Sequence, residues 1–331
     1  MRYLLRCIVI VIMTGEIMAC GILFRPAEAA DLPVIRLGLL QFGTVNWEVT
    51  VMRDRLAQQR GINIEPVALA DKDAAAIALL SGQVDAIVTD WLWVARQRMS
   101  GKDFTFVPFS MAAGGVMAGP GSGLRNVTDL AGRHIGVGGG PDDKSWLLLR
   151  AYAQKSAGLD LLKTADIQFS APPVLNEMIQ RGKLDAVLNF WQFNAQLQAK
   201  GYHEIISIHD ILATLGIDRP PPLLGWVFHE RWADAHPETA RALLDASFDA
   251  KDRLLREEAV WQELRPLMKA PDDRLFAVLK TGYRAGIPSG YGPADVEAAR
   301  KTLAVMKSVD PAATAGLTDL PLGTFWSGYR R

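Results

Sequence analysis

A segment of this sequence recurs one hundred residues further along the chain. The first copy runs Ser-Gly-Gln-Val-Asp-Ala over residues 81–86 and reaches a tryptophan at Trp91. The second runs Arg-Gly-Lys-Leu-Asp-Ala over residues 181–186 and reaches Trp191. Solenoid repeats have periods of roughly 20–50 residues, far shorter than this spacing. Two copies therefore predict two similar lobes rather than a repeat array.

Both copies have the pattern of a helix, a glycine, a short apolar strand and a second helix. Gly82 and Gly182 end the first helix, because glycine adopts the left-handed conformation at little cost. Asp85 and Asp185 are expected to begin the strands in a structural role. In open α/β sheets ligands bind beyond the carboxyl ends of the strands. We therefore expect one cleft, faced by Asp90, Trp91, Asn189 and Trp191.

The rest of the chain alternates strand and helix patterns, which is typical of an α/β protein. Its 331 residues are 49% hydrophobic and 22% charged, enough for a sizeable core in one or two domains. The formal net charge is zero, so nothing indicates a nucleic-acid partner. The predicted fold is α/β with two lobes, each a mostly parallel sheet flanked by helices, joined by two hinge crossings.

The two crossings are predicted from glycine and proline content. Residues 110–118 contain adjacent glycines that can absorb changes in backbone angles. Residues 222–228 follow a proline-rich connector and read as a strand that returns to the first lobe. The predicted boundaries are 30–115 for the first part of lobe 1, 116–224 for lobe 2, and 225–331 for the return to lobe 1 and the C-terminal helices.

Residues 1–29 have the pattern of a secretory signal peptide, with a basic start, an apolar run and a small-residue site near Ala29. This predicts a cleaved leader and a periplasmic protein. A retained membrane anchor and a lipid attached at Cys20 are the alternatives. Both cysteines, Cys7 and Cys20, lie in this segment. The exported protein would therefore have no thiol for catalysis or metal binding.

Three sequence blocks together resemble a known family. Gly-Thr-Val-Asn-Trp follows the first predicted strand at 43–47, Leu-Ala-Gly-Arg-His-Ile-Gly-Val spans 130–137, and Gly-x-x-Asp-Ala occurs twice. Their order is similar to that in periplasmic solute-binding proteins of ABC importers, of the nitrate/sulfonate/taurine and thiamine-precursor type. The resemblance implies a type II periplasmic-binding fold that closes on a small ligand and docks on an inner-membrane permease. We expect a monomer with no cofactor.

The resemblance also implies which residues contact the ligand, because in this family the contacts follow the strands. Carried over by position, they are Gly43, Thr44, Asn46, Trp47, Asp71, Asp73, Asp90, Trp91, Lys144, Ser145, Asn189, Phe190 and Trp191. Asp142 and Asp143 precede Lys144 in the same loop and are included in the predicted site.

The charges of this predicted mouth favour a cationic or zwitterionic organic ligand. Five aspartates stand against Lys72 and Lys144 only, and tryptophans offer stacking or cation–π contacts. One alternative is an oxyanion (nitrate, a sulfonate or taurine) held at the glycine-rich helix start of residues 138–140. The other is a hard metal ion, Ca²⁺ or a lanthanide, held by Asp90, Asp142 and Asp143. Several of the aspartates can equally be helix N-caps.

An enzyme on the same fold is a further alternative, because pyrimidine synthases of thiamine biosynthesis resemble these binders. Such an enzyme would need a cofactor lysine, a reactive histidine and a cysteine-rich segment. The five histidines lie in predicted strands or at helix edges and are expected to be structural. A dinucleotide-binding loop is not indicated either, because Pro141 replaces the third glycine of Gly-x-Gly-x-x-Gly. We expect a binding protein rather than an enzyme.

Overall fold

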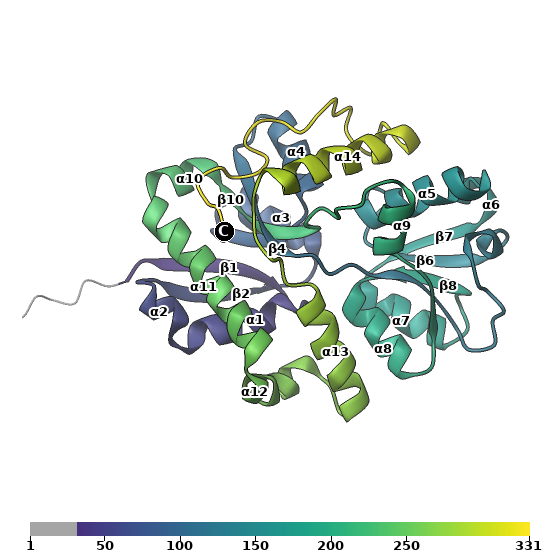
Figure 1. The fold of residues 1–331 in the computed structure, drawn as a ribbon, viewed down its shortest axis with the longest axis horizontal. Coiled ribbons are helices and arrows are strands. Elements are labelled where there is room, and N and C mark those ends of the chain that lie inside the picture. Colours follow the sequence, from purple (N-terminus) through teal and green to yellow (C-terminus); the bar gives the residue numbers. More distant parts are fainter. Residues whose placement is uncertain (1–31) are drawn as a thin grey trace, which may run out of the picture. The chain divides into compact units, whose positions relative to one another are not determined.

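The computed structural model describes residues 32–331, which form two five-stranded sheets with helices packed on them (Figure 1). The predicted leader, its cleavage site and the alternative lipid site at Cys20 lie outside the described residues. Within residues 32–331, no helix is both long and apolar enough to span a bilayer.

The first sheet combines strands from distant parts of the chain. Its strands are β1 (Val34–Leu40), β2 (Asn63–Leu69), β3 (Ala86–Thr89), β4 (Phe104–Ser110) and β10 (Leu224–His229). Their order is β2-β1-β3-β10-β4. The first three are parallel, and β10 runs antiparallel to both β3 and β4. We call this sheet with its helices the first lobe.

The second sheet has the same plan. Its strands are β5 (Gly115–Ala118), β6 (His134–Gly138), β7 (Asp166–Ser170), β8 (Ala186–Asn189) and β9 (His203–Ser207). The order is β7-β6-β8-β5-β9, with β5 antiparallel to β8 and β9. We call this sheet with its helices the second lobe. The antiparallel strands β5 and β10 follow the two chain crossings, so the predicted two-lobe α/β fold is confirmed; the exact lobe boundaries stay a prediction.

The helices connect the strands and cover both sheets. In the first 218 residues they are α1 (Val45–Val51), the π-helical η1 (Met52–Leu56), α2 (Ala57–Gln59), α3 (Lys72–Leu80), α4 (Trp91–Met99), the 3₁₀ turn η2 (Val127–Leu130), α5 (Lys144–Ala157), α6 (Leu161–Thr164), α7 (Pro172–Gln180), α8 (Trp191–Ala199) and α9 (Ile208–Thr214). After β10 they are α10 (Glu230–Ala235), α11 (Pro237–Arg256), α12 (Glu258–Met268), α13 (Asp273–Ala285) and α14 (Pro293–Val309). The helical segment formed by α1, η1 and α2 is interrupted within η1, where Arg55 has a positive φ of 77°.

The hundred-residue repeat of the sequence is also a repeat of structure. α3, β3 and α4 begin 100 residues before α7, β8 and α8 respectively. Asp85 accepts the backbone N–H of Arg36 at 2.7 Å, and Asp185 accepts that of His134 at 2.8 Å. Asp85 thus connects the start of β3 to β1, and Asp185 connects the start of β8 to β6. The structural role predicted for both aspartates is confirmed.

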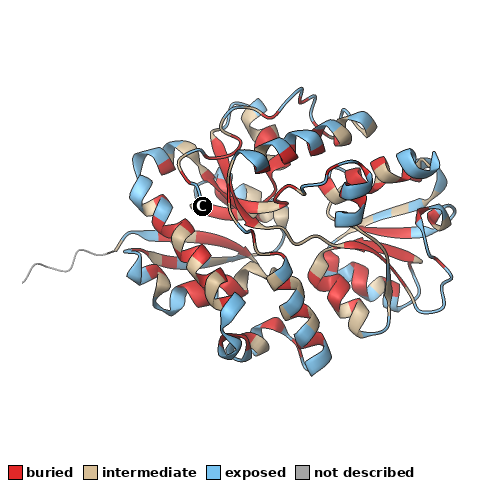
Figure 2. Ribbon diagram, viewed as in Figure 1, coloured by how far each residue is buried: buried red, intermediate tan, exposed pale blue. Residues whose placement is uncertain are grey.

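Buried side chains line both faces of the sheets (Figure 2). One cluster in the first lobe is charged: Lys251 Nζ lies 2.5 Å from Glu48 Oε2, and both side chains are buried. Tyr283 donates to the same Glu48 oxygen at 2.6 Å, and Ser247 donates to the other. This cluster joins α1, α11 and α13, so the C-terminal helices are fastened to the first lobe by polar as well as apolar contacts.

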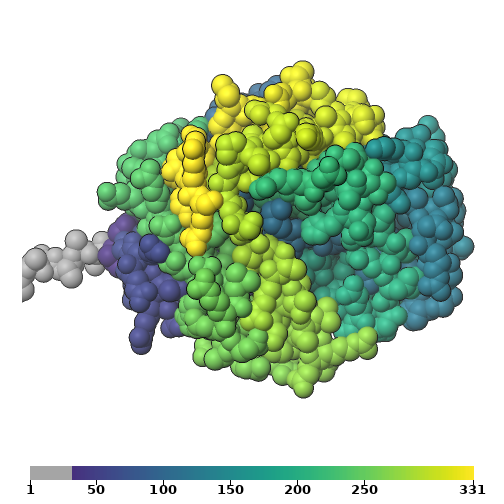
Figure 3. Space-filling model, in the orientation of Figure 1, coloured from purple at the N-terminus to yellow at the C-terminus, as the bar shows by residue number. Residues whose placement is uncertain are grey.

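Two of the C-terminal helices also reach the second lobe. α13 contacts α8, and α14 contacts α5. In Figure 3 these yellow-green segments meet the teal second lobe, and the surface is hollowed beside the contact. Arg150 of α5 is ion-paired with Asp310, directly after α14, at 2.7 Å. The lobes are therefore linked by side-chain contacts in addition to the two chain crossings.

Candidate functional site

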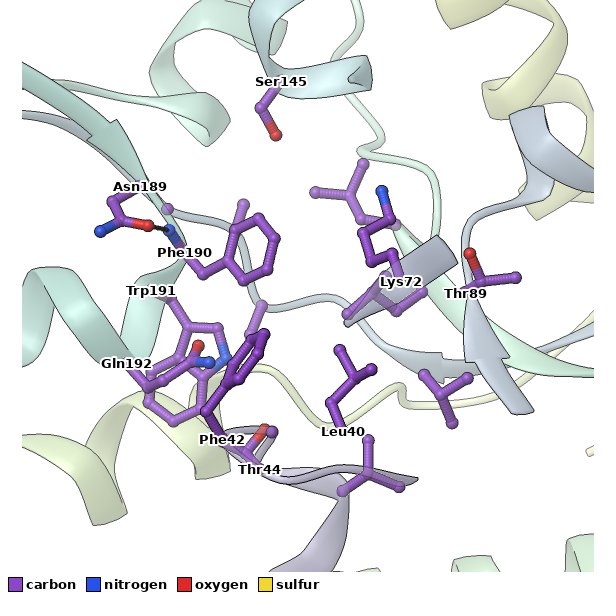
Figure 4. A pocket seen from close by; sticks show the side chains of 18 of the residues that line it. Leu40, Phe42, Thr44, Lys72, Thr89, Ser145, Asn189, Phe190, Trp191 and Gln192 are labelled. Carbon is purple, nitrogen blue, oxygen red and sulfur yellow. Dashed lines mark hydrogen bonds between the residues drawn. The ribbon is translucent and has the colours of Figure 1, made fainter. Parts of the chain in front are cut away.

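The carboxyl ends of the parallel strands of both lobes open into a cleft with two adjoining chambers. The inner chamber has an aromatic and aliphatic wall with a few polar groups, and ten of its residues are labelled in Figure 4. It is lined by Gly38, Leu40, Phe42, Gly43, Thr44, Val45, Lys72, Ala75, Val88, Thr89, Ala112, Ala113, Gly114, Lys144, Ser145, Asn189, Phe190, Trp191, Gln192, Leu223 and Leu224. Lys72 and Lys144 are the charged side chains of this lining.

The outer chamber adjoins the inner one and is more strongly charged. It shares Phe42, Lys72, Thr89 and Phe190 with the inner chamber. Its other lining residues are Asp71, Asp73, Ala76, Asp90, Trp93, Arg96, Gly139, Gly140, Pro141, Asp142, Asp143, Phe169, Ser170, Ala171 and Pro172. Lys72 thus stands at the boundary, where the apolar wall gives way to the carboxylates.

Two lysines and two aspartates pair across the cleft in a reciprocal way. Lys72 of the first lobe lies 3.4 Å from Asp143 of the second, and Lys144 of the second lobe lies 3.9 Å from Asp90 of the first. Lys72 also lies 3.6 Å from Asp90. Each lobe therefore contributes one positive and one negative charge to the same cluster.

The cluster holds Lys72 and Asp90 in their charged forms. Burial opposes the charge of Lys72, but the carboxylates of Asp143 and Asp90 outweigh it and raise the pKa of Lys72 above its ordinary value. Burial also opposes the charge of Asp90. The ammonium groups of Lys144 and Lys72, together with the N–H of Trp93, prevail and lower the pKa of Asp90 to about 2.

Four of the five aspartates that line the outer chamber already have a protein partner. Asp71, Asp90 and Asp143 cap α3, α4 and α5 by accepting backbone N–H groups at 2.8–2.9 Å. Asp142 is ion-paired at 2.6 Å with Arg96, an arginine that lies inside α4. The acidic mouth expected from the sequence is thus largely neutralised by helix ends, lysines and Arg96.

Lys144 differs from these residues, because its charge is poorly satisfied. Its side chain is 9% exposed, and within residues 32–331 its ammonium makes one ion pair, the 3.9 Å contact with Asp90, and no hydrogen bond. Such a buried donor costs free energy unless an acceptor is supplied. The neighbouring Ser145 points into the inner chamber (Figure 4). Lys144 and Ser145 together provide hydrogen-bond donors on the wall of the inner chamber.

The start of α8 adds further donors on the same chamber. Its N-cap residue, Phe190, makes no side-chain capping bond, so the first-turn N–H groups keep their positive character. Gln192, in that first turn, is buried and lines the chamber, and its amide has no hydrogen bond to any described residue. Asn189 is committed elsewhere, because its amide donates to Pro172 and Asn176 at 3.0 Å.

The structure gathers most of the predicted site residues at the cleft. The inner chamber contains Gly43, Thr44, Lys144, Ser145, Asn189, Phe190 and Trp191, and the outer one contains Asp71, Asp73, Asp90, Asp142 and Asp143. Three predicted contacts need correction, since they line neither chamber: Asn46, Trp47 and Trp91. The amide of Asn46 donates to the carbonyls of Leu40 and Gly43, and both tryptophans are buried in the core.

Trp47 still contributes indirectly. Its ring meets the ring of Trp191 edge-on at 6.1 Å, so it supports a residue that does line the inner chamber. From the other direction Gly282 of α13 lies against Trp191, where an added Cβ would come within 2.9 Å of the ring. Trp191 is therefore held between the first lobe and α13.

The sequence prediction missed several lining residues. Phe42, Thr89 and Gln192 each adjoin a predicted position, and the rule that strand ends face the ligand could have found them. Arg96 carries no such signal, because it lies mid-helix and reaches Asp142 only through the approach of the lobes. The same holds for the chain-crossing residues Ala112–Gly114, whose place in the lining depends on the hinge geometry.

The alternative metal site is not assembled. Asp90 and Asp143 are both paired with Lys72, Asp90 also with Lys144, and Asp142 with Arg96. Among residues 32–331, no group of three or more histidine, cysteine, aspartate or glutamate side chains could hold a metal ion. The cleft therefore offers no set of oxygen ligands for Ca²⁺ or a lanthanide.

Comparison with protein families decides the affiliation of the chain. Residues 58–257 match the NMT1/THI5-like family model. The chain belongs to the NMT1/THI5-like family. This agrees with the thiamine-precursor-type resemblance seen in the sequence. A search of curated proteins finds no match for this chain.

Solved structures show the same fold at low sequence identity. The alkanesulfonate-binding protein SsuA from Xanthomonas axonopodis pv. citri, bound to MOPS, is 17% identical, with a TM-score of 0.70, over 90% of this chain and 99% of that one. The periplasmic aliphatic sulphonate-binding protein SsuA from Escherichia coli is 15% identical, with a TM-score of 0.66, over 87% and 94%. This NMT1/THI5-like chain thus has the two-lobe fold of periplasmic solute-binding proteins.

The fold also carries enzymes. The desulfurization enzyme DSZB is 12% identical to this chain, with a TM-score of 0.58, over 88% of this chain and 95% of that one. Fold alone therefore does not separate binding from catalysis in this NMT1/THI5-like protein. In the described part of the chain, neither chamber is lined by a histidine or a cysteine.

Proposed function

We propose that this protein is the substrate-binding component of an ABC import system and that it captures a small organic anion between its lobes. The observation that carries the proposal is the position of Lys144, which lines the inner chamber, makes one ion pair at 3.9 Å and donates no hydrogen bond to any described residue. An oxyanion placed there would also meet Ser145, the amide of Gln192 and the bare start of α8.

The remainder of the inner chamber suits the organic part of such a ligand. Phe42, Phe190 and Trp191 supply aromatic surface, and Leu40 and Leu224 supply aliphatic surface. Burying an apolar tail against them contributes roughly 25 cal/mol per Å² of area removed from water. Inorganic ions such as nitrate would leave this wall in contact with water, so an alkyl or aryl anion fits better.

This proposal selects the oxyanion alternative over the cationic ligand favoured by the sequence. The sequence argument set five aspartates against two lysines, whereas four of the five, Asp71, Asp90, Asp142 and Asp143, have a partner in the protein. The structural relatives named for alkanesulfonate and aliphatic sulphonate binding are in accord with an anion. A sulfonate or carboxylate with a short apolar tail is therefore the proposed ligand class.

The proposal extends to where the protein works and with what. A periplasmic location and a permease partner follow from the leader pattern in the sequence and from the fold shared with periplasmic binding proteins. We propose a monomeric binding protein without a cofactor rather than an enzyme. Support comes from the histidines, which pair elsewhere: His134 with Asp166, and His229 with Asp103, both at 2.7 Å.

Thermal unfolding of the purified protein with matched ligands tests this function. Propanesulfonate and propylamine have the same tail and opposite charges. At about 100 times its Kd a ligand stabilises the native state by about 2.7 kcal/mol, which raises Tm by several degrees. We expect propanesulfonate to raise Tm and propylamine to have no effect. Stabilisation by the amine alone would reverse the assignment, and conversion of the ligand during incubation, followed by NMR, would identify an enzyme.

A lysine substitution localises the effect. Lys144→Met keeps the apolar stem and removes the charge, so we expect it to abolish the shift produced by propanesulfonate. Lys155→Met removes a charge from the same helix at an exposed position and should leave the shift intact. Unchanged binding by Lys144→Met would remove Lys144 from the site.

A further inference from the structure

Asp90 occupies an unusual place, because it contacts both lysines that line the inner chamber. Its Oδ2 atom lies 3.6 Å from Lys72 Nζ and 3.9 Å from Lys144 Nζ. Both separations exceed a normal hydrogen-bond length. Asp90 therefore attracts both ammonium groups but accepts a hydrogen bond from neither. A ligand anion would interact with the same two ammonium groups as Asp90.

The carboxylate of Asp90 is also fixed in position and in charge. Its Oδ1 atom accepts the N–H of Trp93 at 2.8 Å, which holds it as the N-cap of α4. The residue is 6% exposed, so it cannot swing out into solvent when a ligand arrives. Its low pKa of about 2 keeps it ionised at all working pH values. A fixed negative charge thus lies in the outer chamber, beside the two lysines that line the inner one.

The formal charges of the cluster balance before any ligand binds. Lys72 and Lys144 contribute two positive charges, and Asp90 and Asp143 contribute two negative charges, so the sum is zero. A singly charged anion brings the cluster to one net negative charge, and a doubly charged anion brings it to two. The repulsion between Asp90 and the ligand grows in proportion to the ligand's charge.

We propose that Asp90 is a specificity-determining residue that restricts the cleft to singly charged organic anions and excludes doubly charged ones. The inference rests on the anion-binding function proposed above and adds the charge state of the ligand. It also explains why a site with two lysines carries a buried carboxylate beside them. Without Asp90 the same lysines would attract a dianion more strongly than a monoanion.

The test compares two ligands with the same tail and a similar tetrahedral head. Propanesulfonate carries one charge, and propylphosphonate in mildly alkaline buffer carries two. Asp90→Asn removes the carboxylate charge, and Asn is as good an N-cap as Asp, so α4 keeps its start. Calorimetric titration gives the two dissociation constants for each protein. We expect the wild type to prefer the sulfonate, and Asp90→Asn to shift the ratio of the constants at least about tenfold towards the phosphonate.

The informative quantity is the ratio of the dissociation constants of propanesulfonate and propylphosphonate. Loss of the contact between Asp90 and Lys144 could loosen the closed cleft, but it would weaken both ligands equally and cancel in the ratio. Asp272→Asn is the matched control, since Asp272 caps α13 by accepting the N–H of Leu275 at 2.8 Å, lines neither chamber and makes no ion pair with either lysine. Its ratio should stay at the wild-type value. Asp90→Ser keeps a capping hydroxyl and should shift the ratio as Asp90→Asn does.

The outcomes separate this inference from the function on which it rests. If the wild type binds neither propanesulfonate nor propylphosphonate, the anion-binding function fails and the inference falls with it. If the wild type binds anions but Asp90→Asn and Asp90→Ser leave the ratio where Asp272→Asn leaves it, the anion-binding function stands and the role of Asp90 is overturned.

Discussion

At the scale of single residues, the molecule uses buried charge in two different ways. The pair of Glu48 and Lys251 is closed, because Tyr283 and Ser247 complete the hydrogen bonds of the carboxylate and Lys251 also lies 4.0 Å from the ring centre of Phe109. The cluster around Lys144 is open, because its donors face a chamber. The pair of Glu48 and Lys251, whose hydrogen bonds are complete, holds the C-terminal helices on the first lobe. The ammonium of Lys144 donates no hydrogen bond to a described residue and is available to a ligand.

We predict that Lys251→Met destabilises the protein by about 3–5 kcal/mol, because it leaves the carboxylate of Glu48 buried without its cation. Urea denaturation measures the loss. Lys280→Met is the control: Lys280 pairs with the exposed Glu258 at 2.6 Å, and its removal should cost less than about 1 kcal/mol. Equal losses in the two variants would contradict the special role of the buried pair.

At the scale of elements, β5 is the strand with the tightest surroundings. It enters the second sheet between β8 and β9, immediately after the first chain crossing. A Cβ at Gly114 would overlap the carbonyl oxygen of Asn189, which is backbone and cannot rotate away. The glycine is therefore required by a close approach of two chain segments, and the segment it touches carries part of the inner chamber.

We predict that Gly114→Ala lowers the free energy of unfolding by about 1–3 kcal/mol and weakens anion binding, because the displaced Asn189 backbone leads directly into Phe190 and Trp191. Gly119→Ala, just beyond the other end of β5, should be nearly neutral, since its Cβ would lie 3.5 Å from Tyr202. Denaturation and calorimetry check both properties. A stable, fully binding Gly114→Ala protein would show that the crossing tolerates movement.

The elements were also the level at which sequence reasoning worked best. The hundred-residue repeat predicted the matched units around β3 and β8, because glycine ends and apolar runs are local signals. The interruption of the helical segment at Arg55, where φ is positive, has no such local signal. Strand ends were found correctly, and most of the predicted site residues line the cleft.

Side-chain partners were harder to predict than positions. Asp71, Asp90 and Asp143 were placed at the cleft, but their accepted N–H groups and their lysines depend on how two helices and two lobes approach. Arg96 illustrates the limit, since nothing local links it to Asp142, 46 residues away. The partners of these aspartates, and with them the charge that remains for a ligand, could therefore not be derived from the sequence.

At the scale of the whole molecule, three ion pairs cross between the lobes at the cleft: Lys72–Asp143, Lys144–Asp90 and Arg96–Asp142. They lie at the mouth and are reached by solvent to different degrees, so dissolved salt can compete with them. We expect ligand binding to hold the two lobes together and salt to let them move apart. The hinge crossings at 110–118 and 222–228 would absorb the movement.

We predict that the ligand-free protein expands when NaCl is raised to about 1 M, where the screening length falls to about 3 Å, and that saturating propanesulfonate prevents the expansion. Small-angle scattering gives the radius of gyration in each condition. Arg96→Gln should already be expanded at low salt, because it lacks the 2.6 Å contact with Asp142. Superimposable curves in all conditions would show that these pairs do not control the cleft.

The repeat that builds the two lobes differs at one telling position. Asp90 precedes α4, and its counterpart one hundred residues later, Phe190, precedes α8. The carboxylate of Asp90 caps the start of α4, whereas Phe190 makes no side-chain capping bond at the start of α8. The two lobes therefore differ in charge at the cleft. The start of α4 carries a negative carboxylate, and the start of α8 carries the partial positive charge of its N–H groups. A molecule with a single charged end can settle there in only one orientation, although the scaffold around it is nearly symmetric.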